Sequence, residues 1–301
     1  MPAAWRVLAR TEACRLRKGK GIIMNFRQKG LSAQDRSLLR TIYLLAWPAI
    51  LEQLLQTIVQ YTDTAMVGRI SPQASAAIGL TTTMTWLVGS PMGALGIGVL
   101  ACIAESIGAH REELAGSIAV QALYFVLGIG LLLGVLTLSI SPLLPSWLGA
   151  DPEIRHDASL YFSIICTPMI FRASTIILGA ALRGSGDTRH PMYANVMMNI
   201  TNVVLNFFLI YDPRVVTVGY RSLFIPGAGL KVTGAALATA ASYCVGGLFM
   251  FLMYYRNPQL SPKGHCLKYD ASLAGRCLRI AFPVALERVS ACLGQVVFTS
   301  L

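Results

Sequence analysis

The sequence predicts an all-α polytopic membrane protein, and three observations support this prediction. Hydrophobic residues make up 54% of the chain and charged residues only 13%, whereas about a quarter of a typical soluble domain is charged. The charges are also segregated, because none occurs between Arg69 and Glu105 or between Glu113 and Asp151. Uncharged runs of this length are typical of transmembrane helices or of closely connected pairs of them.

Apolar segments of membrane-spanning length recur along the chain. We expect seven helical spans, near residues 41–67, 76–104, 117–141, 159–182, 191–211, 232–255 and 279–301. Glycines and prolines inside them, such as Gly93 and Pro168, are tolerated in membrane helices, where small residues permit close packing. The lipid bilayer is therefore the first expected partner.

Basic residues set the expected orientation. Ten of the 25 Lys and Arg lie in residues 1–40, which we interpret as a basic cytoplasmic N-terminal segment whose start codon is either Met1 or Met24. Most of the remaining basic residues fall in the loops that share this side, so the positive-inside rule places the N-terminus in the cytoplasm. The net charge of +11 then reflects topology, and we expect no nucleic-acid partner.

The span near 191–211 carries amides on one face. Asn195, Asn199, Asn202 and Asn206 are spaced four, three and four residues apart, in a segment without a charged residue. On a helix this spacing forms one stripe. An unpaired amide in hydrocarbon is costly, so we expect the stripe to face protein or a water-filled cavity. Helix-to-helix adhesion alone is the alternative reading of these amides.

The first span carries a matching polar stripe. Gln53, Gln56, Gln60 and Asp63 are spaced three, four and three residues apart. Two such stripes can face each other around a wet cavity, where each amide is paired or hydrated. Pro48, on the same helix, removes one backbone hydrogen bond and permits a bend. For Glu52 the sequence leaves two roles open, lining the cytoplasmic mouth or pairing with an arginine.

An internal repeat indicates two similar halves. Residues 45–66 and 280–301 align with six identities. The six pairs are Ala46/Ala281, Pro48/Pro283, Leu51/Leu286, Glu52/Glu287, Gln60/Gln295 and Thr64/Thr299. Six spans separate the copies, so both begin on the same side of the membrane, which is the arrangement of parallel-repeat transporters. We therefore expect a six-helix lobe over 41–255, a cytoplasmic inter-lobe loop over 256–278, and over 279–301 the first helix of a second lobe that this chain lacks.

Four motifs carry a resemblance to a known family. They are WPAILEQ (47–53) with DTAMVGR (63–69), RGSGDTRHP (183–191), the asparagine stripe, and GAALATAAS (234–242). In this order they resemble the multidrug and toxic compound extrusion (MATE) transporters, from about residue 40 onward. The resemblance implies a six-helix MATE lobe and a bacterial inner-membrane antiporter that exports cationic or amphipathic compounds.

The resemblance also implies roles for individual residues. Asp63, Asn202, Asn206 and Thr239 match the positions that couple transport to H⁺ or Na⁺, and the choice between the two ions stays open. Gln53, Gln56, Gln60, Asn195 and Asn199 would line the cavity. Bending at Pro48 would follow occupancy of Asp63; a fixed kink used for packing is the alternative reading of this proline. Beyond Na⁺ at Asp63 we expect no metal and no cofactor. Part of the family has an Asp where this chain has Asn206, which leaves charge for one monovalent ion.

Other functions fit the sequence less well. The four histidines lie in loops without metal-binding spacing, so an enzyme is not expected. A lipid-linked oligosaccharide flippase of the same superfamily is the alternative. It would require several cationic side chains inside the lobe, whereas only Arg172 and Arg288 lie within the expected spans of this chain. A non-transporting remnant is the third reading.

Overall fold

The computed structural model describes residues 33–68, 72–147, 149–218, 221–225, 227–260 and 268–300. Residues 1–47 and 48–301 form two separate compact units. Most of the basic segment expected at 1–40 lies outside the described residues. The packing described below is that of the second unit.

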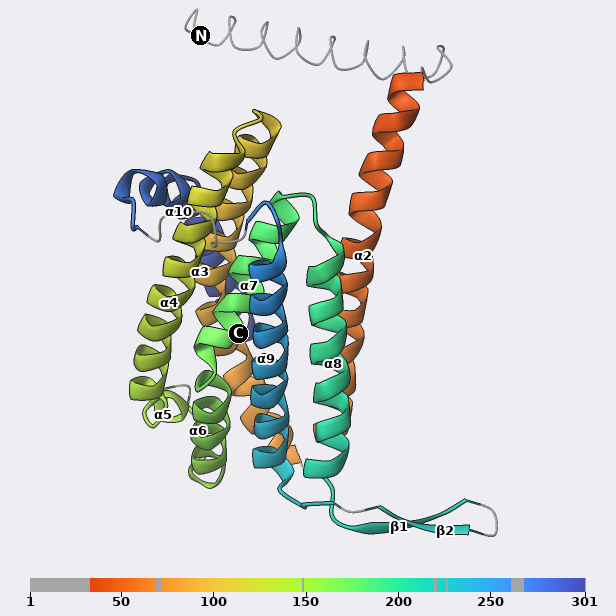
Figure 1. The fold of residues 1–301 in the computed structure, drawn as a ribbon. Helices are drawn as coiled ribbons and strands as arrows, with labels where there is room; N and C mark the ends of the chain where they lie inside the picture. Colours follow the sequence, from red (N-terminus) through yellow and green to blue (C-terminus); the bar gives the residue numbers. More distant parts are fainter. Residues whose placement is uncertain are drawn as a thin grey trace, which may run out of the picture. The chain divides into compact units, whose positions relative to one another are not determined.

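Helices account for nearly all of the described chain (Figure 1). Within the described residues, four helical segments are long and apolar enough to cross a bilayer: Met84–Gly108, Glu112–Ile140, Arg189–Leu209 and Lys231–Arg256. The prediction of an all-α polytopic membrane protein is confirmed. The helices are α2 (Ala33–Gly68), α3 (Pro72–Gly108), α4 (Glu112–Ile140), α5 (Leu144–Trp147), α6 (Pro152–Cys166), α7 (Met169–Gly184), α8 (Arg189–Leu209), α9 (Lys231–Arg256) and α10 (Ala271–Ser300).

The fourth expected span is not one continuous helix. The segment predicted as a single helix over 159–182 consists of α6 and α7, which meet at an angle of 51° after Cys166. Pro168 lies at the break: it has no backbone N–H to continue the helix, and its own backbone leaves helical geometry, with φ −84° and ψ 38°. The Thr167 hydroxyl bonds back to the Ser163 carbonyl at 2.9 Å. Proline inside this span therefore interrupts the helix, although the sequence predicted one continuous span.

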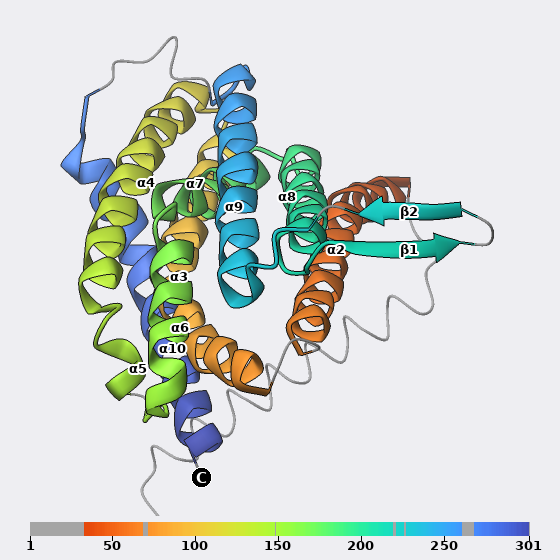
Figure 2. The same cartoon turned by 90° about the horizontal axis from the view of Figure 1, so that it is seen from below.

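A β-hairpin that the sequence analysis did not predict joins α8 to α9. Strands β1 (Arg214–Val218) and β2 (Arg221–Ile225) are antiparallel, and Arg214 pairs with Ile225. Three valines and a threonine in β1 favour the extended backbone. The hairpin projects beyond the ends of α8 and α9 (Figures 1 and 2).

Glycines allow the central helices to approach one another closely. A Cβ placed on Gly247 of α9 would lie 2.5 Å from the Phe171 carbonyl oxygen of α7, and one on Gly184 would lie 2.8 Å from the Leu100 carbonyl oxygen of α3. Such separations between helix backbones are possible only without a side chain. The glycines in these spans are therefore packing positions.

The last helix is fixed to the bundle along its first half. Ala274, Cys277 and Ala281 of α10 are buried, and Gly98 of α3 leaves room for the α10 backbone at Cys277. Gln121 of α4, 1% exposed, also binds the chain just before α10 through the Lys268 carbonyl and the Asp270 N–H. Helix α10 begins at Ala271, earlier than the span expected at 279–301.

Replacing Gly247 by alanine tests this packing. We expect Gly247→Ala to lower the free energy of unfolding by about 1–3 kcal/mol, because the new Cβ overlaps the α7 backbone. Titration with SDS in mixed micelles measures that free energy. The matched control is Gly128→Ala in α4, where a Cβ would meet nothing within 4 Å; helix propensity then predicts no loss. Equal destabilisation by both changes would contradict the close α7–α9 contact.

Candidate functional site

The asparagine face of α8 is buried in the bundle. Asn195, Asn199, Asn202 and Asn206 are 4%, 8%, 4% and 2% exposed. Apolar residues on the other side of α8, including Ile200 and Val204, are exposed, as expected for a surface that meets lipid. Helix α9 packs along α8, and the second-unit part of α2 reaches the same face through side-chain hydrogen bonds (Figure 1).

A first polar group lies where α2 meets the beginning of α8. The Asn195 amide donates to Glu52 Oε1 at 2.9 Å and to the Pro191 carbonyl at 3.0 Å. Gln56 Nε2 donates to Asn195 Oδ1 at 3.1 Å. Arg183, at the end of α7, is paired with Glu52 at 3.3 Å. This inner group, formed by Glu52, Gln56, Arg183 and Asn195, joins three helices.

A second polar group lies two turns further along α8. Asn202 Nδ2 donates to Thr239 Oγ1 of α9 at 3.2 Å, and Asn206 Nδ2 donates to Asn202 Oδ1 at 3.0 Å. Three residues that the sequence analysis assigned to ion coupling therefore share one hydrogen-bond network. We call Asn202, Asn206 and Thr239 the outer group.

Asn199 lies between the two groups. Its Nδ2 is buried and, within the described part of the chain, has no hydrogen-bond partner. An unpaired buried amide donor is costly, and water or a polar ligand between α8 and its neighbours would remove this cost.

The remaining predicted residues lie on α2. Gln53 is exposed and is not part of either group. Pro48 is buried inside the helix. Gln60 and Asp63 belong to the helical part of α2, but their side chains lie outside the described residues.

The structure selects one of the two roles that the sequence left open for Glu52. Glu52 pairs with Arg183, whereas Asp187 contacts His190. The signal for the observed pair was available, because Glu52 lies in an apolar span and Arg183 at the end of another. The sequence could not show that these two residues meet.

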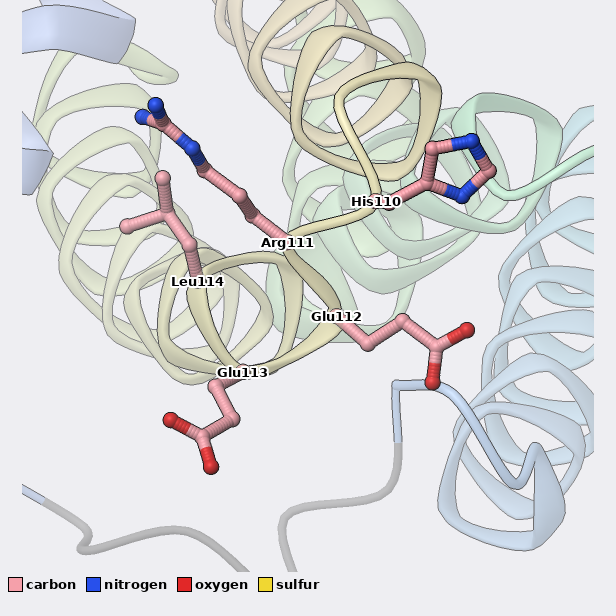
Figure 3. A pocket seen from close by; sticks show the side chains of 5 residues that line it. All are labelled: His110, Arg111, Glu112, Glu113 and Leu114. Carbon is pink, nitrogen blue, oxygen red and sulfur yellow. The ribbon is translucent and has the colours of Figure 1, made fainter.

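A pocket at the turn between α3 and α4 is formed by neighbouring residues of the chain, unlike the inner and outer groups (Figure 3). Its walls come from one continuous stretch: His110, Arg111, Glu112, Glu113 and Leu114. Figure 3 shows Glu112 and Glu113 pointing in different directions, and the five side chains do not converge on a common point. The two glutamates occupy the first turn of α4, where acidic side chains stabilise a helix. This pocket contains no predicted site residue, and we do not assign it a function.

Comparison with known proteins identifies a family that contains this helical bundle and its buried polar residues. A family model described as MatE matches residues 48–208, which is just over half of the chain. The chain belongs to the MATE family. The matched segment includes Glu52, the break at Pro168 and all four asparagines of α8.

Two of the relatives are named as multidrug resistance proteins. The chain is 27% identical over 257 residues to a probable multidrug resistance protein NorM of Thermotoga maritima, covering 85% of this chain and 53% of the relative. It is 30% identical over 180 residues to the multidrug resistance protein PmpM of Pseudomonas aeruginosa, covering 58% of this chain and 37% of the relative. The MATE chain thus spans about half the length of the first of these relatives.

Solved MATE structures share the fold. An outward-facing multidrug resistance MATE transporter superposes with a TM-score of 0.75 at 26% identity, covering 86% of this chain and 55% of that one. An inward-facing MATE transporter gives 0.68 at 25% identity, covering 81% and 55%.

A double-mutant cycle tests the inner group. Because removing one partner leaves the other charge in largely buried surroundings, we expect Glu52→Gln and Arg183→Gln each to destabilise the MATE chain. The double variant should lose less than their sum, with a coupling of about 1 kcal/mol. SDS titration of unfolding measures all four proteins.

The control cycle uses Arg276 and Glu105, which are also ion-paired but whose side chains are 45% and 65% exposed, against 28% and 13% for Arg183 and Glu52. Solvent screening predicts a coupling close to zero there. Additive effects of the Glu52 and Arg183 substitutions would show that this ion pair does not stabilise the contact between α2 and α7.

Proposed function

We propose that the protein is a multidrug efflux transporter that exchanges small cationic or amphipathic compounds for H⁺ or Na⁺. We place it in the bacterial inner membrane with its N-terminus in the cytoplasm. The observation that carries the proposal is the outer group, in which two buried amides and a half-buried hydroxyl share hydrogen bonds in a bundle of the MATE family. The relatives named as multidrug resistance proteins support the substrate class.

Helix register supports a place for Asp63 beside the outer group. Helices α2 and α8 run in the same direction (Figure 1), and Gln56 bonds to Asn195, 139 residues later. The same offset from Asp63 leads to Asn202. Seven residues are almost two full helical turns, so Asp63 and Asn202 follow Gln56 and Asn195 on the same two faces. We infer that position 63 of α2 is level with the outer group.

The chemistry of this group suits a monovalent cation. A carboxylate in surroundings poor in water is stabilised when it binds a proton or a cation. Amide and hydroxyl oxygens, such as those of Asn202, Asn206 and Thr239, are hard ligands that can complete the shell of Na⁺. With one carboxylate in the set, one positive charge balances it, whether as H⁺ or as Na⁺.

Transport requires that occupancy of the group changes the shape of the protein. Pro48 lies on the same helix as Asp63 and weakens the backbone hydrogen bonding of α2 there. We propose that ion binding at Asp63 biases a bend at Pro48. The repeat of 45–66 at 280–301, together with relatives of about twice this length, supports a second lobe against which this one rocks.

Single-cysteine labelling tests the proposed topology. In a protein whose native cysteines have been replaced, we expect Gln259→Cys to react with an impermeant maleimide only from the cytoplasmic side. His156→Cys should react only from outside. Both positions are exposed, Gln259 in the segment after α9 and His156 near the beginning of α6, and they lie at opposite ends of the bundle in the proposed topology. Labelling of position 259 from outside intact cells would reverse the orientation.

Neutralising the carboxylate tests the coupling role. We expect Asp63→Asn, in the protein expressed from its complete gene, to reduce ion-driven efflux of a cationic dye at least roughly tenfold, since the group then cannot exchange a charge. Asp157→Asn, at an exposed carboxylate on α6, is the matched control and should transport normally. Dye efflux from vesicles with an imposed pH or Na⁺ gradient is the measurement, at matched expression. Full efflux in Asp63→Asn would exclude Asp63 from coupling.

The same efflux assay tests the role of the outer group with two further variants. Thr239→Val and Asn202→Leu should shift the ion concentration needed for half-maximal efflux more than the dye concentration. If both variants change only the dye dependence, the outer group binds helices together and does not contribute to coupling.

A further inference from the structure

Two buried cysteines meet where α3 packs against α10. Cys102 of α3 is 1% exposed and Cys277 of α10 is 0% exposed, and both are free thiols. Their side chains are hydrogen-bonded to each other. The two residues are far apart in the sequence, so a bond between their sulfur atoms would join α10 covalently to the middle of the bundle.

A glycine brings the two helix backbones to the separation that a disulfide requires. The Cα atoms of a disulfide lie about 4.4–6.8 Å apart, whereas the axes of packed helices are usually about 8–10 Å apart. Gly98 is one turn before Cys102 on α3. A Cβ there would overlap the Cys277 carbonyl oxygen and would lie 3.2 Å from the Ala281 Cβ. The close approach of α3 and α10 at this level therefore suits a direct link between the thiols.

The thiols lie close to one aqueous end of the bundle. Cys102 is six residues before the end of α3, and Cys277 is six residues after the beginning of α10, which is about 9 Å along each helix. An ion pair between Arg276 and Glu105, at 3.4 Å, bridges the same two helices beside them, with side chains that are 45% and 65% exposed. A small solute therefore needs only a local opening to reach the sulfur atoms.

We propose that Cys102 and Cys277 form a redox switch, which a small hydroperoxide such as H₂O₂ closes by converting the two thiols into a disulfide. The peroxide oxidises one thiol to a sulfenic acid and is itself reduced to water. The second sulfur then attacks the sulfenic sulfur, and a second water leaves. Two thiols and one H₂O₂ thus give one disulfide and two waters, with two electrons passing from the sulfur atoms to the peroxide. A dithiol reductant reverses the reaction.

The position of the pair determines what the disulfide would do. In the proposed topology α3 ends and α10 begins at the cytoplasmic side. The chain superposes more closely on an outward-facing MATE structure than on an inward-facing one, and an outward-facing transporter is closed toward the cytoplasm. A bond between α3 and α10 would hold this side closed and stop the cycle. This consequence rests on the proposed efflux function, whereas formation of the bond does not.

Counting thiols tests whether the bond forms. The protein expressed from its complete gene, with every cysteine except Cys102 and Cys277 replaced by alanine, is reconstituted in vesicles and treated with H₂O₂. After denaturation each free thiol is tagged with a polyethylene glycol maleimide. We expect two tags before treatment, none after it and two again after dithiothreitol. Peptide mass spectrometry of the peroxide-treated protein with all its native cysteines should show the peptides of Cys102 and Cys277 joined, which guards against misfolding of the replaced variant.

Matched single variants make the result specific. In Cys102→Ala, peroxide should yield no joined peptide, although Cys277 remains. Two free thiols after a treatment that fully oxidises a dithiol peptide, or a disulfide that forms only between separate molecules, would overturn the proposal.

Efflux measurements test the effect of the bond on transport. Peroxide should lower dye efflux at least about fivefold, because the conformational step is blocked, and dithiothreitol should restore it. Efflux by Cys277→Ala should not respond to peroxide. An equal loss in Cys277→Ala, or full efflux by protein that mass spectrometry shows to be cross-linked, would overturn the switch.

Unfolding separates this proposal from the efflux proposal. The disulfide should raise the SDS concentration at which the protein unfolds, because a cross-link restricts the unfolded chain, and Cys102→Ala should show no such shift. An unshifted midpoint in cross-linked protein would contradict a bond that holds α10 to α3. If untreated protein exports no dye, the efflux proposal fails, while the thiol count and the unfolding shift still decide whether the bond forms and holds the helices together.

Discussion

Polar groups buried in a membrane protein must find their partners inside the protein, and the asparagine face of α8 imposes this requirement on its neighbours. Four amides on one face cannot meet hydrocarbon. Helix α9 supplies Thr239, and α2 supplies Glu52 and Gln56. Because Glu52 also pairs with Arg183, the same requirement extends to the end of α7. The relative positions of these helices follow from where the amides are satisfied.

Glycine provides the complementary constraint on the apolar side of the bundle. Lipid chains are as apolar as leucine, so helices in a bilayer are held together by close packing rather than by exclusion of water. Gly247 and Gly184 permit backbone contacts that any side chain would prevent. At Gly89 and Gly93 the freed space is taken by guanidinium groups instead. The same residue type thus serves packing at some positions and leaves room for charge at others.

The sequence predicted much of this, and the limits have physical causes. The stripe of α8 was predictable because a period of 3.6 residues places its amides on one face. The meeting of Glu52 with Arg183 was not, since local patterns carry no information about contacts 131 residues apart. The break at Pro168 was missed because membrane helices often tolerate proline. The hairpin was missed because a short valine-rich segment between long apolar runs gives a weak signal.

The attachment of α10 to the bundle has a mechanical consequence. Gly98, the Gln121 hydrogen bonds and the buried Ala281 hold the beginning of α10 against α3 and α4. Beyond Ala281 no described residue of α10 is fully buried, and Pro283 follows two residues later with one backbone hydrogen bond missing. Helix α10 is therefore anchored to α3 and α4 as far as Ala281, and Pro283 is the position at which its direction can change with the least loss of backbone hydrogen bonding.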